Sequence, residues 1–220
     1  LKTYFYKMDY KIAEFKTSLI KVGLSYGDSV FLSTSLGMLG KPEKVKSFSK
    51  ISNALLNSLI EIIGPKGNIF VPTYSYSFGN KRKIFSVNNT KSKLGQFPNF
   101  FLKKKSVYRS IDPMISVAGM GSDVKNILFK ISDTSYGKNC VFERLLKVKN
   151  LKCCNVGLGN NWVPFIHYVD WLNKVPFRYD KYFKGIIIDR NKKRKTYNWH
   201  YPVRNLSEKY RSNGYKIGMI

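Results

Sequence analysis

Short apolar segments that end in turns of small residues, and that alternate with helix-like segments, limit the folds open to this chain. Residues 29–33, 69–71 and 151–157 form apolar runs of strand length. Apolar residues recur at helical spacing in residues 9–22 and 52–63, and further helices are expected at 122–131, 141–146 and 165–173. Strands alternating with helices are typical of an α/β fold. We therefore expect a single large domain over residues 1–220, with a mixed central β-sheet flanked by helices in an αβα sandwich-like arrangement.

Other segments fill in this outline. Residues 76–100 are rich in Gly, Asn, Lys and Ser, which predicts a long loop of the kind that often carries function in a compact domain. Residues 116–119 are expected to form a strand. Residues 182–189 and 192–199 are expected to form a hairpin across a turn at 189–191.

Composition excludes several classes of protein. Hydrophobic residues make up 43% of the chain, which is enough for a packed core. We expect no membrane insertion and a cytoplasmic protein, because no apolar run reaches the ~18 residues of a membrane helix and the start lacks a signal peptide. The cysteines are Cys140, Cys153 and Cys154, whose number and spacing fit neither a disulfide framework nor a zinc site. We therefore expect no metal.

The formal net charge of +26 admits three interpretations: nucleic-acid binding, attraction to anionic lipid, or a lysine-rich surface with anionic small-molecule partners. The basic residues are spread along the whole chain, and the densest clusters fall in expected turns or helix ends. We therefore favour solvated surface lysines and expect no nucleic acid as partner. A substrate that carries phosphates would still be attracted by this field.

Two histidines, His167 and His200, are the candidates for proton transfer. Pro164 is well placed to start a helix, and His167 and Asp170 then lie three positions apart on one helix face. A carboxylate beside an imidazole fixes its tautomer and stabilises the imidazolium. The alternative is a helix histidine whose ring nitrogens are satisfied by a neighbour. His200, between Trp199 and Tyr201, is expected to be a packed surface histidine.

Polar residues follow two expected strands and precede a third. The amides and hydroxyls of the turn from Ser33 to Gly37 could hold a phosphate or a thioester carbonyl, although ordinary tight turns share this composition. Thr73 and Tyr74 place two hydroxyls at the matching sheet edge. Further along the chain, Arg109 could meet a phosphate and Asp112 an ammonium group, or the two could pair and stabilise a turn.

Several of these motifs, in this order along the chain, resemble the aminoglycoside 3-N-acetyltransferase family. The resemblance covers about residues 22–185 and rests on Ser33-Thr34-Ser35-Leu36-Gly37, Gly95-Gln96-Phe97-Pro98, Arg109-Ser110-Ile111-Asp112-Pro113 and Pro164-Phe165-Ile166-His167-Tyr168-Val169-Asp170. It implies an enzyme that moves an acetyl or other short acyl group from acyl-CoA to an amine. We expect direct transfer in a ternary complex, with no covalent enzyme intermediate.

The resemblance also implies roles for individual residues. His167 would be the catalytic base and Asp170 its partner. The residues expected to bind the CoA thioester are Ser33, Thr34, Ser35, Leu36, Gly37, Thr73, Arg109 and Ser110. From the residues themselves we expect Tyr74, Asp112 and Arg178 on the acceptor side, the last through phosphates of CoA or of a nucleotide-linked sugar.

Departures from the family pattern point to the acceptor. Asp112 stands where antibiotic-modifying members usually have His, which resembles the subgroup that acylates nucleotide-linked amino sugars for surface polysaccharide. The alternatives are aminoglycoside resistance, a CoA-binding homologue without catalysis, and a nucleic-acid-binding module. The family's Thr is Pro164 here and its Glu is Asp170, and the chain ends earlier than is usual, which predicts a truncated member. The aromatic content favours a homodimer.

Overall fold

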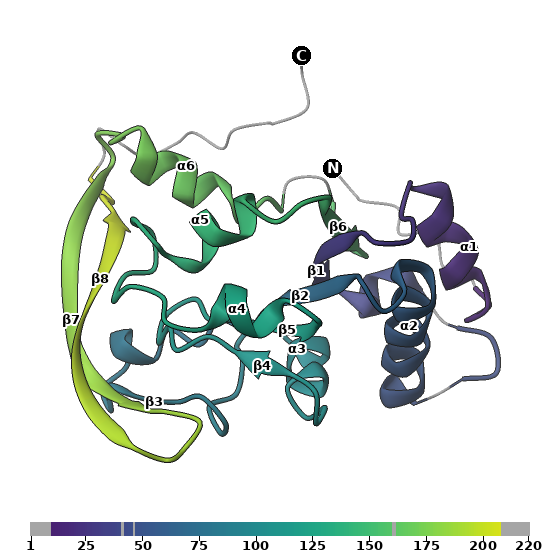
Figure 1. Cartoon of the computed structure of the whole chain (residues 1–220), viewed down its shortest axis with the longest axis horizontal. Coiled ribbons are helices and arrows are strands. Elements are labelled where there is room, and N and C mark those ends of the chain that lie inside the picture. The colour runs from purple at the N-terminus through teal and green to yellow at the C-terminus, as the bar shows by residue number, and fades with distance from the viewer. Residues whose placement is uncertain (1–9, 41, 46, 160–161, 208–220) are drawn as a thin grey trace.

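The computed structural model describes residues 10–40, 42–45, 47–159 and 162–207, and its centre is a mixed five-stranded sheet (Figure 1). The strand order is β4-β5-β2-β1-β6. Strand β1 pairs in parallel with both β2 and β6, whereas β5 is antiparallel to β2 and β4. The bounds of these strands are β1 Ser29–Thr34, β2 Asn68–Pro72, β4 Tyr108–Arg109, β5 Val117–Gly121 and β6 Leu151–Val156.

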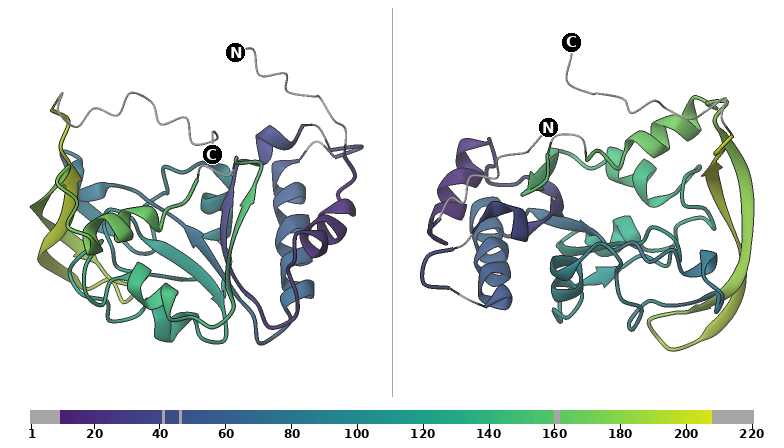
Figure 2. Two further views of the ribbon diagram at one scale, coloured as in Figure 1. Left: turned by 90° about the horizontal axis from the view of Figure 1, so that it is seen from above. Right: turned by 180° about the vertical axis from the view of Figure 1, so that it is seen from behind.

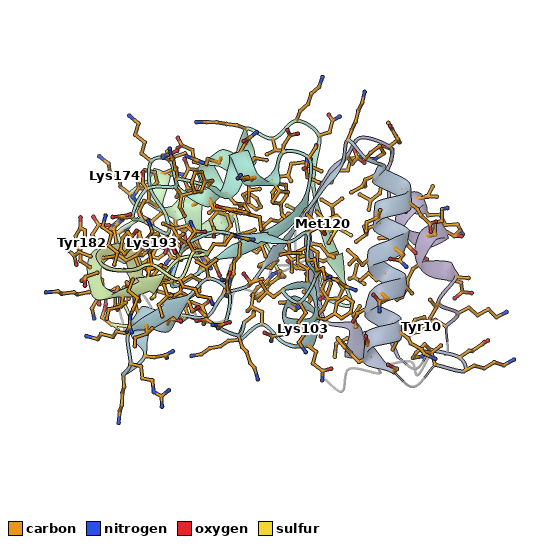
Figure 3. The ribbon with its side chains drawn as sticks, turned by 60° about the horizontal axis from the view of Figure 1, so that its bottom comes forward. Tyr10, Lys103, Met120, Lys174, Tyr182 and Lys193 are labelled. Atoms are coloured by element: carbon orange, nitrogen blue, oxygen red, sulfur yellow. The ribbon has the colours of Figure 1, made fainter. Side chains whose placement is uncertain are left out.

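Helices cover both faces of this sheet (Figure 2). Helices α1 and α2 pack on each other on one side, and α4, α5 and α6 lie on the other. The helices are α1 Glu14–Lys21, α2 Phe48–Ile63, α3 Gln96–Phe101, α4 Val124–Leu128, α5 Val141–Leu146 and α6 Ile166–Leu172, with short 3₁₀ turns η1 Leu36–Leu39 and η2 Ser77–Gly79. The expected α/β fold with a mixed sheet between helices is confirmed.

The two inner strands explain why both faces must be covered. Successive side chains of a strand point to opposite faces, and here both sets are apolar. Val30 and Leu32 of β1 belong to the core under α1 and α2, whereas Phe31 belongs to the core under α4, α5 and α6. In β2, Ile69 and Phe70 divide in the same way. A strand that is apolar on both faces is stable only between two layers.

A second sheet stands at the far side of the molecule from α1 and α2 (Figure 1). It has the order β3-β7-β8, with β3 Ile84–Ser86, β7 Arg178–Ile188 and β8 Arg194–Arg204. Strands β7 and β8 form a long antiparallel hairpin, which confirms the hairpin prediction and extends it. Trp199 of β8 is fully buried against the core under α4, α5 and α6, so the hairpin wraps around that core.

The largest correction concerns residues 76–100, which are not one long loop. They contain η2, β3 and α3, and β3 pairs in parallel with β7 from the end of the chain. Such pairing depends on a partner about a hundred positions away, so local composition could not reveal it. Smaller differences are that α2 begins at Phe48 rather than at 52 and α4 ends at Leu128 rather than at 131. The expected start of the first helix at Asp9 lies outside the described residues.

Candidate functional site

A small cavity opens where the carboxyl ends of the parallel strands β1, β2 and β6 meet. Its volume is about 220 Å³, and its lining residues are Leu32, Ser33, Thr34, Ser35, Pro72, Leu94, Pro98, Leu158 and Trp162. This edge of an open α/β sheet is where ligands usually bind. The structure therefore places three of the five residues predicted for the thioester turn, Ser33, Thr34 and Ser35, around one cavity.

The turn after β1 is held by the loop after β6. The amide of Ser35 donates to the carbonyl of Val156 at 2.8 Å. The indole Nε1–H of Trp162 donates to Ser33 Oγ at 3.0 Å. Gly157 has a φ of +69°, and a Cβ there would lie 2.3 Å from the Ser35 carbonyl oxygen. Only glycine fits this approach, because any side chain would collide with the Ser35 backbone.

One polar atom of this turn has no partner within the protein. Thr34 Oγ1 is buried, lies in a residue that lines the cavity and makes no hydrogen bond. Buried hydroxyls nearly always have a partner, so this atom fits a site that a polar ligand completes. Gly37, in contrast, is exposed and does not line the cavity, and Leu36 is buried in the core under α1 and α2.

A larger and more polar cleft lies beside the small cavity. It has a volume of about 940 Å³, and its lining includes the first residues of α2, the segment from Asn88 to Lys93, and residues of α3 and its end. Lys91, Lys93 and Lys103 line it. Leu94 lines the small cavity and its neighbours Lys93 and Gly95 line the large one, so a single segment borders both.

Arg109 is buried and its guanidinium is wholly engaged within the protein. It donates to the carbonyl oxygens of Thr73 at 2.8 Å, Thr90 at 2.5 Å and Val87 at 3.4 Å, and to the Oγ of Ser116 at 3.0 Å. Burial lowers the pKa of Arg109 to about 9, so it remains charged at neutral pH. Arg109 was predicted to bind the cofactor. In the structure its hydrogen bonds instead connect the end of β2 to the segment before α3 inside the protein.

Thr73 and Ser110, which lie beside Arg109, are also fully buried. Thr73 Oγ1 donates to the Ser116 carbonyl at 3.0 Å and accepts from Arg109 Nε at 3.2 Å. Ser110 Oγ accepts from the amide of Val117 at 3.0 Å. Neither hydroxyl reaches the cavity lining, so the structure does not bring them together with Ser33, Thr34 and Ser35.

Asp112 is likewise buried, with 1% of its surface exposed. Its Oδ1 accepts from the amides of Met114 and Ile115 and from the hydroxyl of Ser135. Burial raises the pKa of Asp112 to about 6, against the lowering effect of these hydrogen bonds. Tyr74 stands near it with a buried hydroxyl that has no partner. Burial first, and then neighbouring tyrosines and Asp112, raise the pKa of Tyr74.

His167 and Asp170 lie on one face of α6, as predicted, but Arg178 from the start of β7 lies between them. Arg178 Nη2 is 2.6 Å from His167 Nδ1, and Arg178 Nε donates to Asp170 Oδ2 at 2.9 Å. His167 Nδ1 is 3.5 Å from that same carboxylate oxygen. Burial, and after it the charge of Arg178, lowers the pKa of His167. The structure thus brings together two predicted catalytic residues and one predicted for the acceptor.

The second histidine serves a different purpose. His200 Nδ1 is 2.7 Å from Thr134 Oγ1 and its Nε2 is 2.7 Å from Asp180 Oδ1. These contacts tie β8 to β7 and to the segment before α5. This agrees with the expectation of a packed histidine.

Comparison with known families decides the identity. A family model described as aminoglycoside 3-N-acetyltransferase matches residues 38–214. The chain belongs to this family. As an aminoglycoside 3-N-acetyltransferase family member, it is an acetyl-CoA-dependent N-acetyltransferase. No curated protein sequence gives a significant match to it.

Solved structures of this family share the fold at low sequence identity. Aminoglycoside acetyltransferase AAC(3)-Xa has a TM-score of 0.72 at 15% identity, over 95% of this chain and 76% of that one. AAC-IIIb in a binary complex with CoASH has a TM-score of 0.73 at 13% identity, over 90% and 77%. YokD from Bacillus subtilis has a TM-score of 0.69 at 16% identity, over 88% and 82%. At these identities the likeness supports the fold alone.

Sequence reasoning missed part of this candidate site. Trp162 and Leu158 line the small cavity, and two lysines of the large cleft, Lys91 and Lys93, stand on the segment predicted to be a long loop. No local pattern links Trp162 to Ser33, which lies 129 positions earlier. The clustering of lysine and asparagine in residues 88–93 was visible, but only the fold shows that it faces a cleft.

Among the described residues, no helix is long and apolar enough to span a bilayer.

Proposed function

We propose that this enzyme transfers the acetyl group of acetyl-CoA directly to an amine of an aminoglycoside-type amino sugar. The amine nitrogen attacks the thioester carbonyl, a nitrogen–carbon bond forms, and the carbon–sulfur bond breaks. The proton lost by the amine passes to His167 and then to the CoA thiolate that leaves. The family match supports this reaction, because the family is named for N-acetyl transfer to an aminoglycoside.

The two adjoining cavities suggest how acetyl-CoA lies in the site. The small cavity is below the ~300–1,000 Å³ usual for whole drug-sized ligands, so we assign it to the acetyl thioester end. Its unpartnered Thr34 hydroxyl supports this assignment. We assign the large cleft, with Lys91, Lys93 and Lys103, to the nucleotide phosphates. Since Thr73 is buried and engaged and the Ser35 amide donates to Val156, we assign the unpartnered Thr34 hydroxyl as the oxyanion donor.

The observation that carries the proposal is the placement of His167. Helix α6 begins four residues after Trp162, which lines the small cavity, and His167 is its second residue. The side chain of His167 is 45% exposed, so an acceptor can reach its ring. Because burial and the charge of Arg178 lower its pKa from 6.5, the imidazole is neutral at pH 7, which is the charge state that a general base requires.

The test is release of thiol from acetyl-CoA with a panel of aminoglycosides and nucleotide-linked amino sugars. We expect turnover with an aminoglycoside, and a loss of about 10²–10⁴-fold in kcat for His167→Ala with CoA binding retained. His200→Gln is the matched control, because its ring belongs to the β7–β8 tie, and it should keep turnover. If His167→Ala keeps near-normal turnover, the assignment of the base is wrong.

A nucleotide-linked amino sugar is the second candidate acceptor, and the charge of the protein favours it. The net charge of +26 repels a polycationic drug and attracts an acceptor that carries phosphates. With such an acceptor, we expect KM to rise as salt is added, because exposed charges are screened. Turnover confined to aminoglycosides would reject this candidate.

A further inference from the structure

The contacts of Arg178 determine which nitrogen of His167 carries the proton. A guanidinium nitrogen can only donate hydrogen bonds, so His167 Nδ1, at 2.6 Å from Arg178 Nη2, must accept. A neutral imidazole has one N–H. The proton of neutral His167 therefore lies on Nε2 in this arrangement, and an Nε2 that carries a proton cannot take another from an amine.

Asp170 competes with Arg178 for the same ring nitrogen. Its carboxylate could accept a hydrogen bond only from a protonated Nδ1, and that contact is long, at 3.5 Å. The oxygen concerned already accepts from Arg178 Nε at 2.9 Å. Arg178 is itself held firmly: its side chain is 10% exposed, and Nη1 donates to the Pro202 carbonyl of β8 at 3.3 Å.

We propose that Arg178 is a positioning residue that keeps the proton of neutral His167 on Nε2. His167 becomes a base only when its Nδ1 exchanges the hydrogen bond from Arg178 for one to Asp170. This rests on the proposed function of His167. After the exchange, Nδ1–H donates to Asp170, and Nε2 has a free electron pair for the proton of the amine. Solvent can carry the proton between the ring nitrogens, because the side chain is 45% exposed.

Charged and titratable groups from several elements face the imidazole. Asp170 lies on α6, Arg178 on β7 and Arg204 on β8, and their charges act on His167 in addition to burial. The ring of Tyr136, from the segment before α5, packs edge-on against the imidazole, with 5.9 Å between the two ring centroids. Arg178 has a hydrogen bond to the imidazole and lowers its pKa, whereas Asp170 raises that pKa and lies 3.5 Å from Nδ1. Substitutions at these two positions should therefore act in opposite directions.

The test is nitrogen-15 NMR of histidine-labelled enzyme, which has two histidines to resolve. The signals that disappear in His167→Gln are those of the His167 ring nitrogens. In the wild-type enzyme without substrates, we expect His167 to carry its proton on Nε2. In Arg178→Met, we expect the proton on Nδ1, a higher pKa for His167, and an acid limb of the kcat profile moved to higher pH. His200 should not change and serves as the internal reference.

Asp170→Asn is a second test, which applies even if Arg178→Met does not fold. In Asp170→Asn, Arg178 keeps its hydrogen bond to Nδ1 and the carboxylate charge is lost, so the proton should stay on Nε2 and the pKa of His167 should fall. A wild-type proton on Nδ1, or an unchanged tautomer in folded Arg178→Met, would overturn the proposal. These spectra need no acceptor, so they remain readable even if no amine in the panel turns over.

Discussion

Replacing Arg109 with Met should greatly lower the free energy of unfolding of this enzyme. The folded variant should bind CoA with unchanged affinity. The side chain of Arg109 is 2% exposed, and its guanidinium supplies donors to the carbonyls of Thr73, Thr90 and Val87. Methionine fills a similar volume but donates nothing. The two carbonyls with short contacts, at 2.8 and 2.5 Å, would then be buried without partners.

The magnitude follows from these contacts. Each buried polar group left without a partner costs about 1–3 kcal/mol, so the two short contacts give a loss of about 2–6 kcal/mol. For a chain of this size, 1 kcal/mol shifts Tm by about 2–4 °C. A central loss of about 4 kcal/mol therefore lowers Tm by about 8–16 °C. Arg109→Lys keeps the charge but not the planar fork, so its loss should be smaller.

Urea unfolding followed by circular dichroism measures the stability, and calorimetric titration with CoA measures binding by the folded variant. A stability loss below about 1 kcal/mol would refute the reasoning, because it would mean that water or relaxation satisfies the carbonyls. Normal stability with lost CoA affinity would instead restore Arg109 as a cofactor-binding residue.

Three further predictions concern single features of the fold and site. Because the pKa of Asp112 is raised from 3.8 to about 6 in the folded state, stability should fall by up to about 3 kcal/mol as pH rises from about 4 to 6. Asp112→Asn should flatten this slope in urea titrations at several pH values, and a slope that persists would contradict it. Gly157→Ala should cost about 1–3 kcal/mol in thermal unfolding, whereas Gly159→Ala, with open space around its Cβ, should be neutral; equal effects would refute the argument. Replacing Lys91, Lys93 and Lys103 with Ala should reduce the binding free energy of CoA by at most about 1 kcal/mol per lysine in titration calorimetry. Binding of a short acetyl thioester should not change. Equal losses for both ligands would refute the assignment of the phosphates to the large cleft.

The pattern of apolar residues predicted most of the central sheet. Val30, Phe31 and Leu32 form a continuous apolar run, and a short run of this kind is typical of a strand that is buried on both faces. The pair of His167 and Asp170 was also predictable, because positions three apart share one face of a helix. Sequence similarity then identified the family, and with it the reaction.

The partners of these residues were decided by the tertiary structure. Arg178 was predicted to meet phosphates, but β7 returns it to α6, where it contacts both His167 and Asp170. Arg109 and Thr73 were predicted at the cofactor, but the antiparallel pairing of β5 with β2 and β4 places them inside the protein.

Sequence by itself therefore determined which residues can do the chemistry, since residue type and local period depend on neighbours along the chain. The fold alone decided which of them face a cavity and which are tied to one another. The reason is physical: burial and charge pairing depend on strands and helices that are distant in sequence, and β3 with β7, or Trp162 with Ser33, meet only when the whole core has formed.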